Sequence, residues 1–295
     1  MGIIIAVLLF SFIIIFHELG HFLLAKKNGI RVDEFSLGLG PTLLGKQIGE
    51  TKFSLKLLPF GGACMMGEDD ADDLSEGSFN SKSVWARMSV VAAGPIFNLI
   101  LACVFCFILI MITGYRSPEI TGVLDGYSAQ EEGLQAGDVI TEINGRNVHI
   151  WDDVSLYTMT HADEAPFKVE YERDGKKYTA KLEPRQLEGD AAPLLGVTSG
   201  DIVKPGIFKS VEYSIYKVKY WMNYTVDSLR MLVTGQAGLK DLSGPVGIVN
   251  AVDDMYQEAA PAGFGVVMLS MMNFGVLLTT NLGILNLLPL PALDG

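Results

Sequence analysis

The sequence contains little cysteine and little positive charge, and each shortage excludes a class of protein. Its three cysteines are Cys64, Cys103 and Cys106, and the polar region from about 116 to 262 has none. A disulfide-stabilised scaffold is therefore excluded. Lys and Arg total 22 against 34 Asp and Glu, for a net charge of −12. Because no basic stripe with interleaved aromatic residues occurs, we predict no nucleic-acid partner.

Apolar residues, in contrast, are abundant. The 295 residues are 49% hydrophobic, and three apolar runs, at about 2–25, 90–113 and 263–288, are long enough to cross a bilayer as helices. The first run has no basic residues before it and no small-residue cleavage site after it, so it is not a signal peptide. Pro289 and Pro291 follow the third run and should break its helix within the bilayer.

Basic residues flank the first two runs on the same side. Lys26, Lys27 and Arg31 follow the first run, and Lys82 and Arg87 precede or open the second. The positive-inside rule then places 26–89 in the cytoplasm. We expect a multi-pass protein of the cell membrane, with the N-terminus and the polar region after the second run outside the cytoplasm.

The first apolar run contains the motif His17-Glu18-Leu19-Gly20-His21. On a helix, HExxH places two imidazoles one turn apart on one face, where they can share a zinc ion, and places the Glu to act as general base on a water. Polar groups at membrane depth are costly and mark functional sites. Asp294 is the favoured third ligand, because it follows a broken membrane helix. His149 and His161 are the alternatives, although isolated histidines of a soluble region usually have no metal role.

The polar regions divide into smaller units. The Gly-rich stretch 31–66 alternates at Phe53, Leu55 and Leu57, which predicts a β-hairpin dipping toward the membrane. Short strand patterns over 117–186, with a hairpin turn at 173–176, predict a compact α/β unit, and 186–206 has the composition of a linker. Residues 208–233 form an amphipathic pattern with an aromatic band, which favours an interfacial helix over a helix packed on the soluble unit.

These motifs together resemble the site-two protease family of intramembrane zinc metalloproteases. The resemblance rests on HELGH in the first run, on Gly94-Pro95-Ile96-Phe97-Asn98 in the second, and on the stretch from Asn286 to Gly295 after the third. Residues 132–145 are similar to a bacterial PDZ domain, and 243–248 to a motif of the bacterial branch that performs regulated intramembrane proteolysis. The resemblance covers nearly the whole chain.

The resemblance implies a fold and its boundaries. The fold class is membrane α-helical, with an inserted extracytoplasmic α/β PDZ domain and a membrane-associated β-hairpin. Three transmembrane helices are present, and a fourth is expected beyond the chain end, so the sequence reads as truncated before the last helix. The implied segments are 1–25 (helix one with HExxH), 26–89 (hairpin and loop), 90–115 (helix two), 116–186 (PDZ domain), 187–262 (linker and interfacial helix) and 263–295 (broken helix three).

The resemblance also implies site residues. His17, His21 and Asp294 would hold Zn²⁺, and Glu18 would be the catalytic base. Three asparagines would serve substrate binding. Asn281 and Asn286 would contact and unwind the substrate helix, and Asn98 would pack helix two against the site. The hairpin would pair with the unwound substrate as an added strand, and the PDZ domain would exclude bulky substrates.

The expected function is hydrolysis of peptide bonds within the transmembrane segments of single-span membrane proteins, by a zinc-activated water. Anti-sigma factors and signal-peptide remnants are the substrate classes that the resemblance suggests, and the lipid bilayer is the surrounding partner. One alternative is a non-catalytic membrane-anchored PDZ adaptor, and a weaker one is a membrane zinc transporter or chaperone. The adaptor predicts no bound zinc, whereas the transporter predicts that Glu18→Gln leaves function intact.

Overall fold

The computed structural model of the protein describes all residues except 1, 68–72, 189–191, 239–243 and 289–295. The chain forms two compact units, of which unit 1 comprises residues 1–105 and 238–295 and unit 2 comprises 106–237. In the described part of the chain, three helices are long and apolar enough to cross a membrane: Ile4–Lys27, Val84–Thr113 and Phe264–Leu285. This confirms that each of the three apolar runs predicted from the sequence forms a helix of membrane-spanning length.

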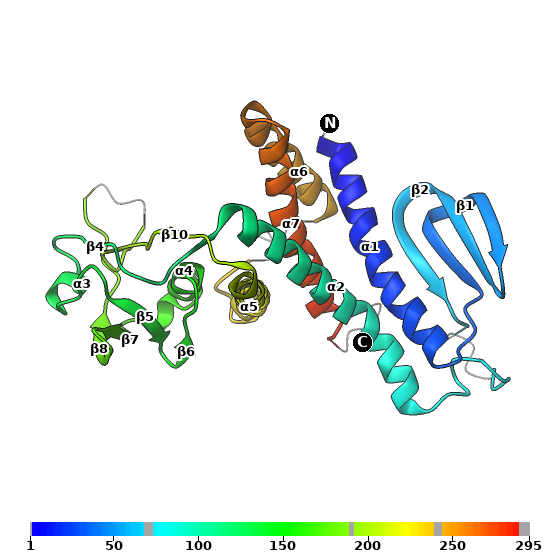
Figure 1. The fold of residues 1–295 in the computed structure, drawn as a ribbon, viewed down its shortest axis with the longest axis horizontal. Coiled ribbons are helices and arrows are strands. Elements are labelled where there is room, and N and C mark those ends of the chain that lie inside the picture. The colour runs from blue at the N-terminus through cyan, green and yellow to red at the C-terminus, as the bar shows by residue number, and fades with distance from the viewer. Residues whose placement is uncertain (1, 68–72, 189–191, 239–243, 289–295) are drawn as a thin grey trace. The chain divides into compact units, whose positions relative to one another are not determined.

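Unit 1 is built around its first helix. Figure 1 shows the hairpin against one side of α1 and helices α6 and α7 against another, and α1 contacts all three. The elements are α1 (Gly2–Lys27), β1 (Glu34–Ile48), β2 (Thr51–Met65), α2 (Val84–Thr113, whose last residues belong to unit 2), α6 (Pro245–Ala259), the 3₁₀ turn Ala260–Ala262 and α7 (Phe264–Leu285).

The end of α1 follows from local chemistry. Gly29 adopts a left-handed conformation with φ of 65°, and the Ile30 N–H donates back to the Ala25 carbonyl over 2.9 Å. This is the hydrogen bond of a Schellman cap, which glycine favours because it has no Cβ atom. Lys26 and Lys27 occupy the last turn, where positive charge complements the helix dipole.

The hairpin is a sheet made from two bent strands. Gly49 and Glu50 join β1 to β2, and Ile48 pairs with Thr51 beside the turn. Near its start, β1 lies between the two halves of β2, so Leu37 has both Leu55 and Gly62 as partners. The second half of β2 therefore forms one edge of this sheet, and β2 contacts α1. This confirms a hairpin in the Gly-rich stretch.

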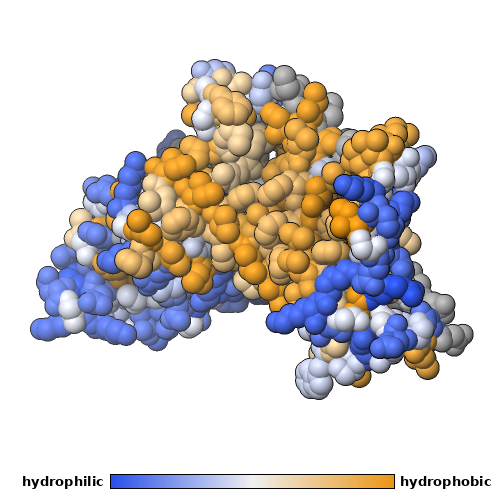
Figure 2. Space-filling view, turned by 45° about the vertical axis from the view of Figure 1, so that its right-hand side comes forward, coloured by the Kyte–Doolittle hydropathy of each residue, from blue (hydrophilic) through white to orange (hydrophobic). Residues whose placement is uncertain are grey.

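Large apolar side chains are exposed in straight rows on the long helices. On α1, Ile4 and Leu8 are 59% and 63% exposed, and on α2, Ile96 and Ile100 are 48% and 47% exposed. Leu44 on the hairpin is 69% exposed. Figure 2 shows hydrophobic side chains covering much of the visible surface. Rows spaced by four residues on helices this apolar suit contact with lipid tails rather than with water.

Unit 2 is an α/β unit with a four-stranded antiparallel sheet in the order β6-β5-β7-β8. Two tight turns, each with positive φ at both central residues, join β5 to β6 at Asn144-Gly145 and β7 to β8 at Asp174-Gly175. The turn predicted at 173–176 is thus confirmed. The elements are β3 (Tyr115–Arg116), β4 (Gly122–Val123), α3 (Ser128–Glu131), β5 (Val139–Ile143), β6 (Arg146–Asn147), α4 (Trp151–Thr160), the 3₁₀ turn Ala162–Glu164, β7 (Phe167–Arg173), β8 (Lys176–Leu182), β9 (Val197–Thr198), β10 (Ile202–Val203) and α5 (Ile207–Val233).

The segment assigned to a linker from residue 187 belongs partly to this unit. Strand β9 pairs with β4 and β10 pairs with β3, and Leu195 is a buried member of the core. The unit therefore extends past residue 186, which corrects the boundary. Strands of two residues are too short to show an alternating pattern, so no pattern in the sequence predicts them.

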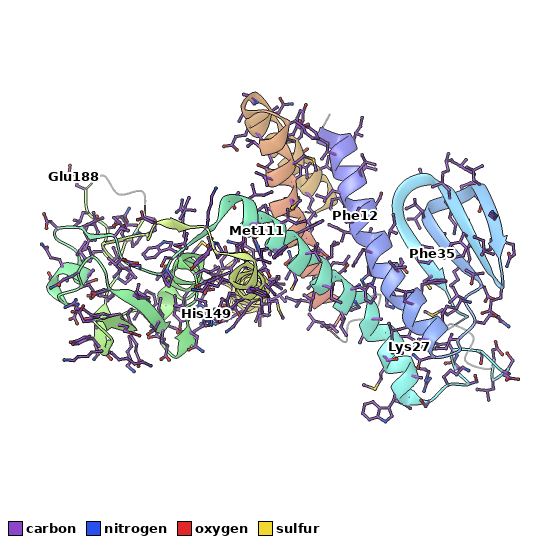
Figure 3. All side chains as sticks on the ribbon, in the orientation of Figure 1. Phe12, Lys27, Phe35, Met111, His149 and Glu188 are labelled. Carbon is purple, nitrogen blue, oxygen red and sulfur yellow. The ribbon has the colours of Figure 1, made fainter. Side chains whose placement is uncertain are left out.

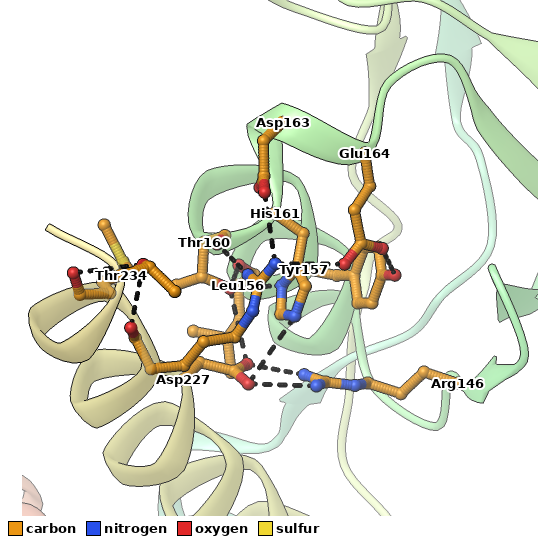
Figure 4. Close-up of polar contacts among 11 residues, drawn as sticks. Arg146, Leu156, Tyr157, Thr160, His161, Asp163, Glu164, Asp227 and Thr234 are labelled. Atoms are coloured by element: carbon orange, nitrogen blue, oxygen red, sulfur yellow. Dashed lines mark hydrogen bonds and ion pairs between the residues drawn. The ribbon is translucent and has the colours of Figure 1, made fainter. Parts of the chain in front are cut away.

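Helix α5 packs on α4 with its polar side. Four polar residues, Ser210, Ser214, Thr225 and Asp227, are buried together with one apolar residue, Val218. Asp227 receives two hydrogen bonds from Arg146, at 2.6 and 3.0 Å. Figure 4 shows this network of polar contacts between α5 and the α4 region. The opposite face exposes apolar side chains: Phe208 92%, Val211 48%, Ile215 56%, Val226 54% and Val233 86%. A helix that packs on a water-soluble unit normally buries its apolar face, so this arrangement is inverted.

Candidate metal centre

Two histidines of α1 face each other in the interior of unit 1. His17 and His21 lie four residues apart on one helix face and are only 4% and 7% exposed. Their Nε2 atoms are 3.1 Å apart. Helical spacing brings the rings together, because residues i and i+4 lie on one face.

A main-chain carbonyl of α2 orients the ring of His21. Nδ1 of His21 lies 2.8 Å from the Val90 carbonyl oxygen. Because a carbonyl can only accept, this Nδ1 carries a proton, and Nε2 of the neutral ring keeps its lone pair. That tautomer is the one in which Nε2 can bind a metal ion.

Two asparagines, from different helices, contact the ring of His17. Nδ2 of Asn98, on α2, lies 3.0 Å from Nδ1 of His17, and Nδ2 of Asn286, just past the end of α7, lies 3.2 Å from its Nε2. Thr279 of α7 donates from its hydroxyl to the Asn98 carbonyl over 3.1 Å. Helices α1, α2 and α7 therefore meet at this imidazole.

Glycines allow this close approach. A Cβ atom at Gly20 would lie 2.6 Å from the Ala93 carbonyl oxygen, and one at Gly94 would lie 2.6 Å from Cε1 of His17. Contacts this short do not occur in folded proteins, so both positions require glycine while the helices keep this spacing.

Glu18 lies on α1 between the two histidines, beside the edge of the hairpin. A Cβ atom at Gly62 of β2 would be 3.3 Å from Cγ of Glu18 and 3.0 Å from the Ser36 carbonyl oxygen. The absence of a side chain at Gly62 therefore lets the strand edge approach the carboxylate. The arrangement places an acidic group and a strand edge at one site.

The two imidazoles fit a zinc ion. Two nitrogen ligands of tetrahedral zinc, each bound at its usual distance, are separated by about 3.3 Å, and the Nε2 atoms of His17 and His21 are 3.1 Å apart. Burial and the imposed tautomer of His21 suit metal binding as well. Within the described residues, no cluster of three or more His, Cys, Asp or Glu side chains occurs, so a third such ligand would come from elsewhere.

The other predicted site residues have different placements. Asp294 and the break at Pro289 and Pro291 lie outside the described residues. Asn281 is partly buried on α7.

His161 lies in unit 2, with Nδ1 2.8 Å from the Thr160 hydroxyl. His149, also in unit 2, stacks on Tyr216 of α5 with ring centroids 3.9 Å apart, and Figure 3 shows where it lies. The structure brings His17, His21, Asn98 and Asn286 together.

Three residues at this centre were not identified from the sequence. Val90 acts through its main chain, which carries no residue-type signal. Gly62 and Thr279 are common residue types, and only the packing of distant segments brings them to the site. Thr279 offered a weak signal, as a polar residue in an apolar run.

Comparisons with known proteins add to this geometry. The model of peptidase family M50 matches residues 5–295. A Clostridium acetobutylicum protein whose name assigns it to the zinc metalloproteases is 39% identical over 294 residues, covering 100% of this chain and 84% of that protein. Regulator of sigma-W protease RasP of Bacillus subtilis is 30% identical, covering 98% and 86% respectively. The PDZ domain of the SdrC-like protein of Listeria monocytogenes aligns with 30% of this chain and 87% of that domain, at 24% identity and a TM-score of 0.23, too low to assign a fold.

Proposed function

The chain belongs to peptidase family M50, as a metalloprotease of the site-two type, and on this premise we propose that it cleaves peptide bonds within transmembrane segments of single-span membrane proteins. The observation that carries the proposal is the pair of buried imidazoles, with Nε2 atoms 3.1 Å apart, on a helix long and apolar enough to cross a membrane. Polar groups at that depth are costly and are kept for function.

The residues have distinct roles in this reaction. His17 and His21 would hold Zn²⁺, and Asp294, which lies outside the described residues, is the proposed third ligand. Zinc held there would activate a water and polarise the scissile carbonyl. Glu18 takes the proton from the attacking water and passes it to the leaving amine.

The edge of the hairpin can hold a segment of the substrate in an extended conformation. A helical substrate hides its peptide bonds in intrahelical hydrogen bonds, so cleavage needs local unwinding. The second half of β2 forms a sheet edge, and Gly62 lies against Glu18, so a strand added there would bring its backbone to the base. Asn281 and Asn286 of the α7 region are proposed to contact the unwound segment.

The proposed substrates are anti-sigma factors and signal-peptide remnants anchored by one span. The name of one similar protein, a regulator of sigma-W protease, supports the first class. We place the N-terminus and unit 2 outside the cytoplasm, from the basic residues Lys26, Lys27 and Arg31 at the end of α1. Unit 2, which we take to be a PDZ domain, would then exclude substrates with bulky extracytoplasmic parts.

Helix α5 is proposed to lie in the membrane interface. Its apolar face is exposed while its polar face packs on α4, which suits a helix that meets lipid on one side and protein on the other. It begins beside the end of α2, where the Ser210 hydroxyl lies 3.1 Å from Sδ of Met111 and Tyr213 stacks on Tyr115 at 3.6 Å. That attachment holds the start of α5 close to a membrane-spanning helix.

Co-expression with a tagged single-span substrate tests the function. The wild type should release the cleaved fragment and Glu18→Gln should not, while both retain zinc in elemental analysis, because the imidazoles are unchanged. Glu50→Gln is the matched control, since Glu50 is exposed and pairs with Lys26 at 2.5 Å; it should cut as the wild type does. Equal cleavage by Glu18→Gln would refute the catalytic assignment.

The same experiment tests a non-catalytic adaptor. One observation favours binding by unit 2: a pocket of about 720 Å³ between α4 and the segment 192–199, lined by apolar residues such as Trp151, Met159 and Leu194. A pure adaptor would carry no zinc and would leave the tagged substrate uncut in every variant. Zinc in the purified wild type together with cleavage would exclude that alternative.

A further inference from the structure

Asn98 combines a contact to a proposed metal ligand with a buried oxygen that lacks a partner. The residue is completely buried, and its Nδ2 lies 3.0 Å from Nδ1 of His17. Among the described residues, its Oδ1 has no hydrogen-bond partner. An unsatisfied amide oxygen in an apolar interior costs about 1–3 kcal/mol. A group kept at that cost calls for a physical reason.

When no metal is bound, the contacts to Val90, His21 and Asn98 can form one chain of hydrogen bonds, provided that the Asn286 amide turns its oxygen toward Nε2 of His17 in place of the Nδ2 that lies 3.2 Å away. Nδ1 of His21 donates to the Val90 carbonyl, which leaves Nε2 of His21 as an acceptor. Nε2 of His17 can then donate across 3.1 Å to that atom. Nδ1 of His17 is left as an acceptor, and it takes a hydrogen bond from the amino group of Asn98.

Metal binding through both Nε2 atoms reverses this order at one ring. Nε2 of His17 must give up its proton, and the neutral ring then carries its proton on Nδ1. The amino group of Asn98 would now face an N–H group, so two donors would oppose each other. A half-turn of the Asn98 amide places Oδ1 at the same position as an acceptor. That turn also satisfies the orphaned oxygen.

We propose that Asn98 is a positioning residue for His17, and that its amide turns over when metal binds, donating to Nδ1 in one state and accepting from it in the other. The inference rests on the proposed function only in taking His17 as a metal ligand. Asparagine suits this role because it has a donor and an acceptor of nearly equal size. The Thr279 hydroxyl donates to the main-chain carbonyl of Asn98 rather than to the side-chain amide itself.

Zinc affinity of the purified protein in detergent, measured by competition with a chelator, tests the inference. Asn98→Leu removes both donor and acceptor at similar volume, and should weaken zinc binding by about 10–100-fold, as loss of a partner of a ligating histidine does. Asn98→Asp can only accept, so it favours the metal-binding tautomer and should bind zinc at least as tightly as the wild type. If Asn98→Leu does not fold, the Asp variant alone decides the question.

Thr279→Val is the matched control for packing. It removes a buried hydrogen bond to the same residue but leaves the side-chain contact to the imidazole intact, so zinc affinity should stay within about threefold of the wild type. Three results would each overturn the inference: unchanged affinity in Asn98→Leu, an equal loss in the Asp and Leu variants, or a loss in Thr279→Val as large as in Asn98→Leu.

A second readout separates this inference from the proposed function. Cobalt placed in the zinc site gives visible absorption that reports the ligand environment, and the band should change in Asn98→Leu but remain in Asn98→Asp. If the wild type binds zinc and cleaves substrate while Asn98→Leu binds zinc equally well, only the role of Asn98 is wrong. A wild type that binds no zinc would overturn the proposed function, and this inference with it.

Discussion

Gly94 of α2 lies directly against His21 of α1: a Cβ atom at residue 94 would overlap Nε2 of that imidazole. The same atom would lie 2.7 Å from Nε2 of His17. The space between the two ring nitrogens is therefore open on its α2 side only because residue 94 has no side chain. That space is where a metal ion shared by the two rings would sit.

Gly94→Ala should accordingly impair metal binding. The new methyl group must displace either the rings or helix α2, and we expect zinc affinity to fall at least about tenfold, with cleavage falling in parallel. Gly265→Ala on α7 is the control, since a Cβ atom there has nothing within 4 Å. Chelator competition on both variants checks the prediction, and equal affinities would contradict it.

Gly62→Ala should affect the reaction and leave the metal in place. A Cβ atom there would lie 3.3 Å from Cγ of Glu18 and 3.0 Å from the Ser36 carbonyl, so the strand edge or the carboxylate must shift by a few tenths of an ångström. We expect kcat/KM to fall about tenfold, because catalytic groups tolerate little displacement, and zinc content to be unchanged.

The control for Gly62→Ala lies on the same hairpin. Gly45→Ala on β1 adds a methyl group whose nearest neighbour is the flexible end of Lys52, at 3.4 Å. Its cleavage rate should match that of the wild type. A comparable loss of kcat/KM in both variants would mean that the hairpin responds to any added bulk, and that the contact between Gly62 and Glu18 has no special role.

The sequence predicted the parts of the centre that depend on local geometry. HELGH fixes His17 and His21 on one face because the helical period is constant. It could not identify Val90 or Gly62, because a main-chain carbonyl and a missing side chain acquire a role only through packing between segments distant in sequence. The position of Asn286 beside His17 depends on packing of the same kind.

Helix α5 shows a second limit of sequence patterns. The spacing of Phe208, Val211 and Ile215 correctly predicted an amphipathic helix over 208–233, and the structure has this helix at Ile207–Val233. A spacing pattern identifies the apolar face but not the surface that the face meets. In the structure the polar face is buried against protein, because Asp227 on that side receives the paired hydrogen bonds of Arg146.

The Arg146–Asp227 pair should be a main contributor to the attachment of α5 within unit 2. Asp227 is 2% exposed, and its carboxylate accepts two hydrogen bonds from the guanidinium. Asp227→Ala leaves that cation without its partner and should lower the free energy of unfolding of unit 2 by about 3 kcal/mol. Proteolysis of residues 106–237 in graded urea, on the solubilised protein, measures the loss.

An exposed pair of the same type provides the comparison for Asp227→Ala. Arg185 and Glu131 also form two hydrogen bonds, at 2.7 and 2.6 Å, but the glutamate side chain is 59% exposed. Glu131→Ala should therefore cost under about 1 kcal/mol. Losses of equal size in the two variants would show that burial of Asp227 does not determine its contribution.

Asp153 predicts a pH dependence of the stability of unit 2. Burial raises the pKa of this carboxyl above its ordinary value of 3.8, although main-chain N–H groups of His149 and Ile150 lower it in part. Between pH 3.8 and the raised pKa the folded state keeps a proton that the unfolded state has lost. The free energy of unfolding should therefore fall as pH rises through that interval.

Asp153→Asn should remove this contribution. Both main-chain hydrogen bonds reach one carboxylate oxygen, Oδ2, at 2.9 and 3.2 Å, and an amide oxygen can accept them without a charge. The variant should be as stable as the wild type near neutral pH, or slightly more so, with a smaller change in stability across the acidic interval. Urea proteolysis at a series of pH values measures both, and an unaltered pH profile would contradict the assignment.

The exposed face of α5 predicts contact with lipid at defined positions. Ile215 is 56% exposed on the apolar face, and Lys209 is exposed on the side of the same helix that carries Asp227, since 18 residues make five helical turns. With the three native cysteines replaced, a fluorophore attached at Ile215→Cys should lose emission when the protein is placed in lipid vesicles that carry lipid-borne quenchers. The same fluorophore on Lys209→Cys should keep its emission in those vesicles. Equal quenching at the two positions would mean that α5 is not oriented by its apolar face, and no quenching at Ile215 would mean that this face meets water or protein instead of lipid.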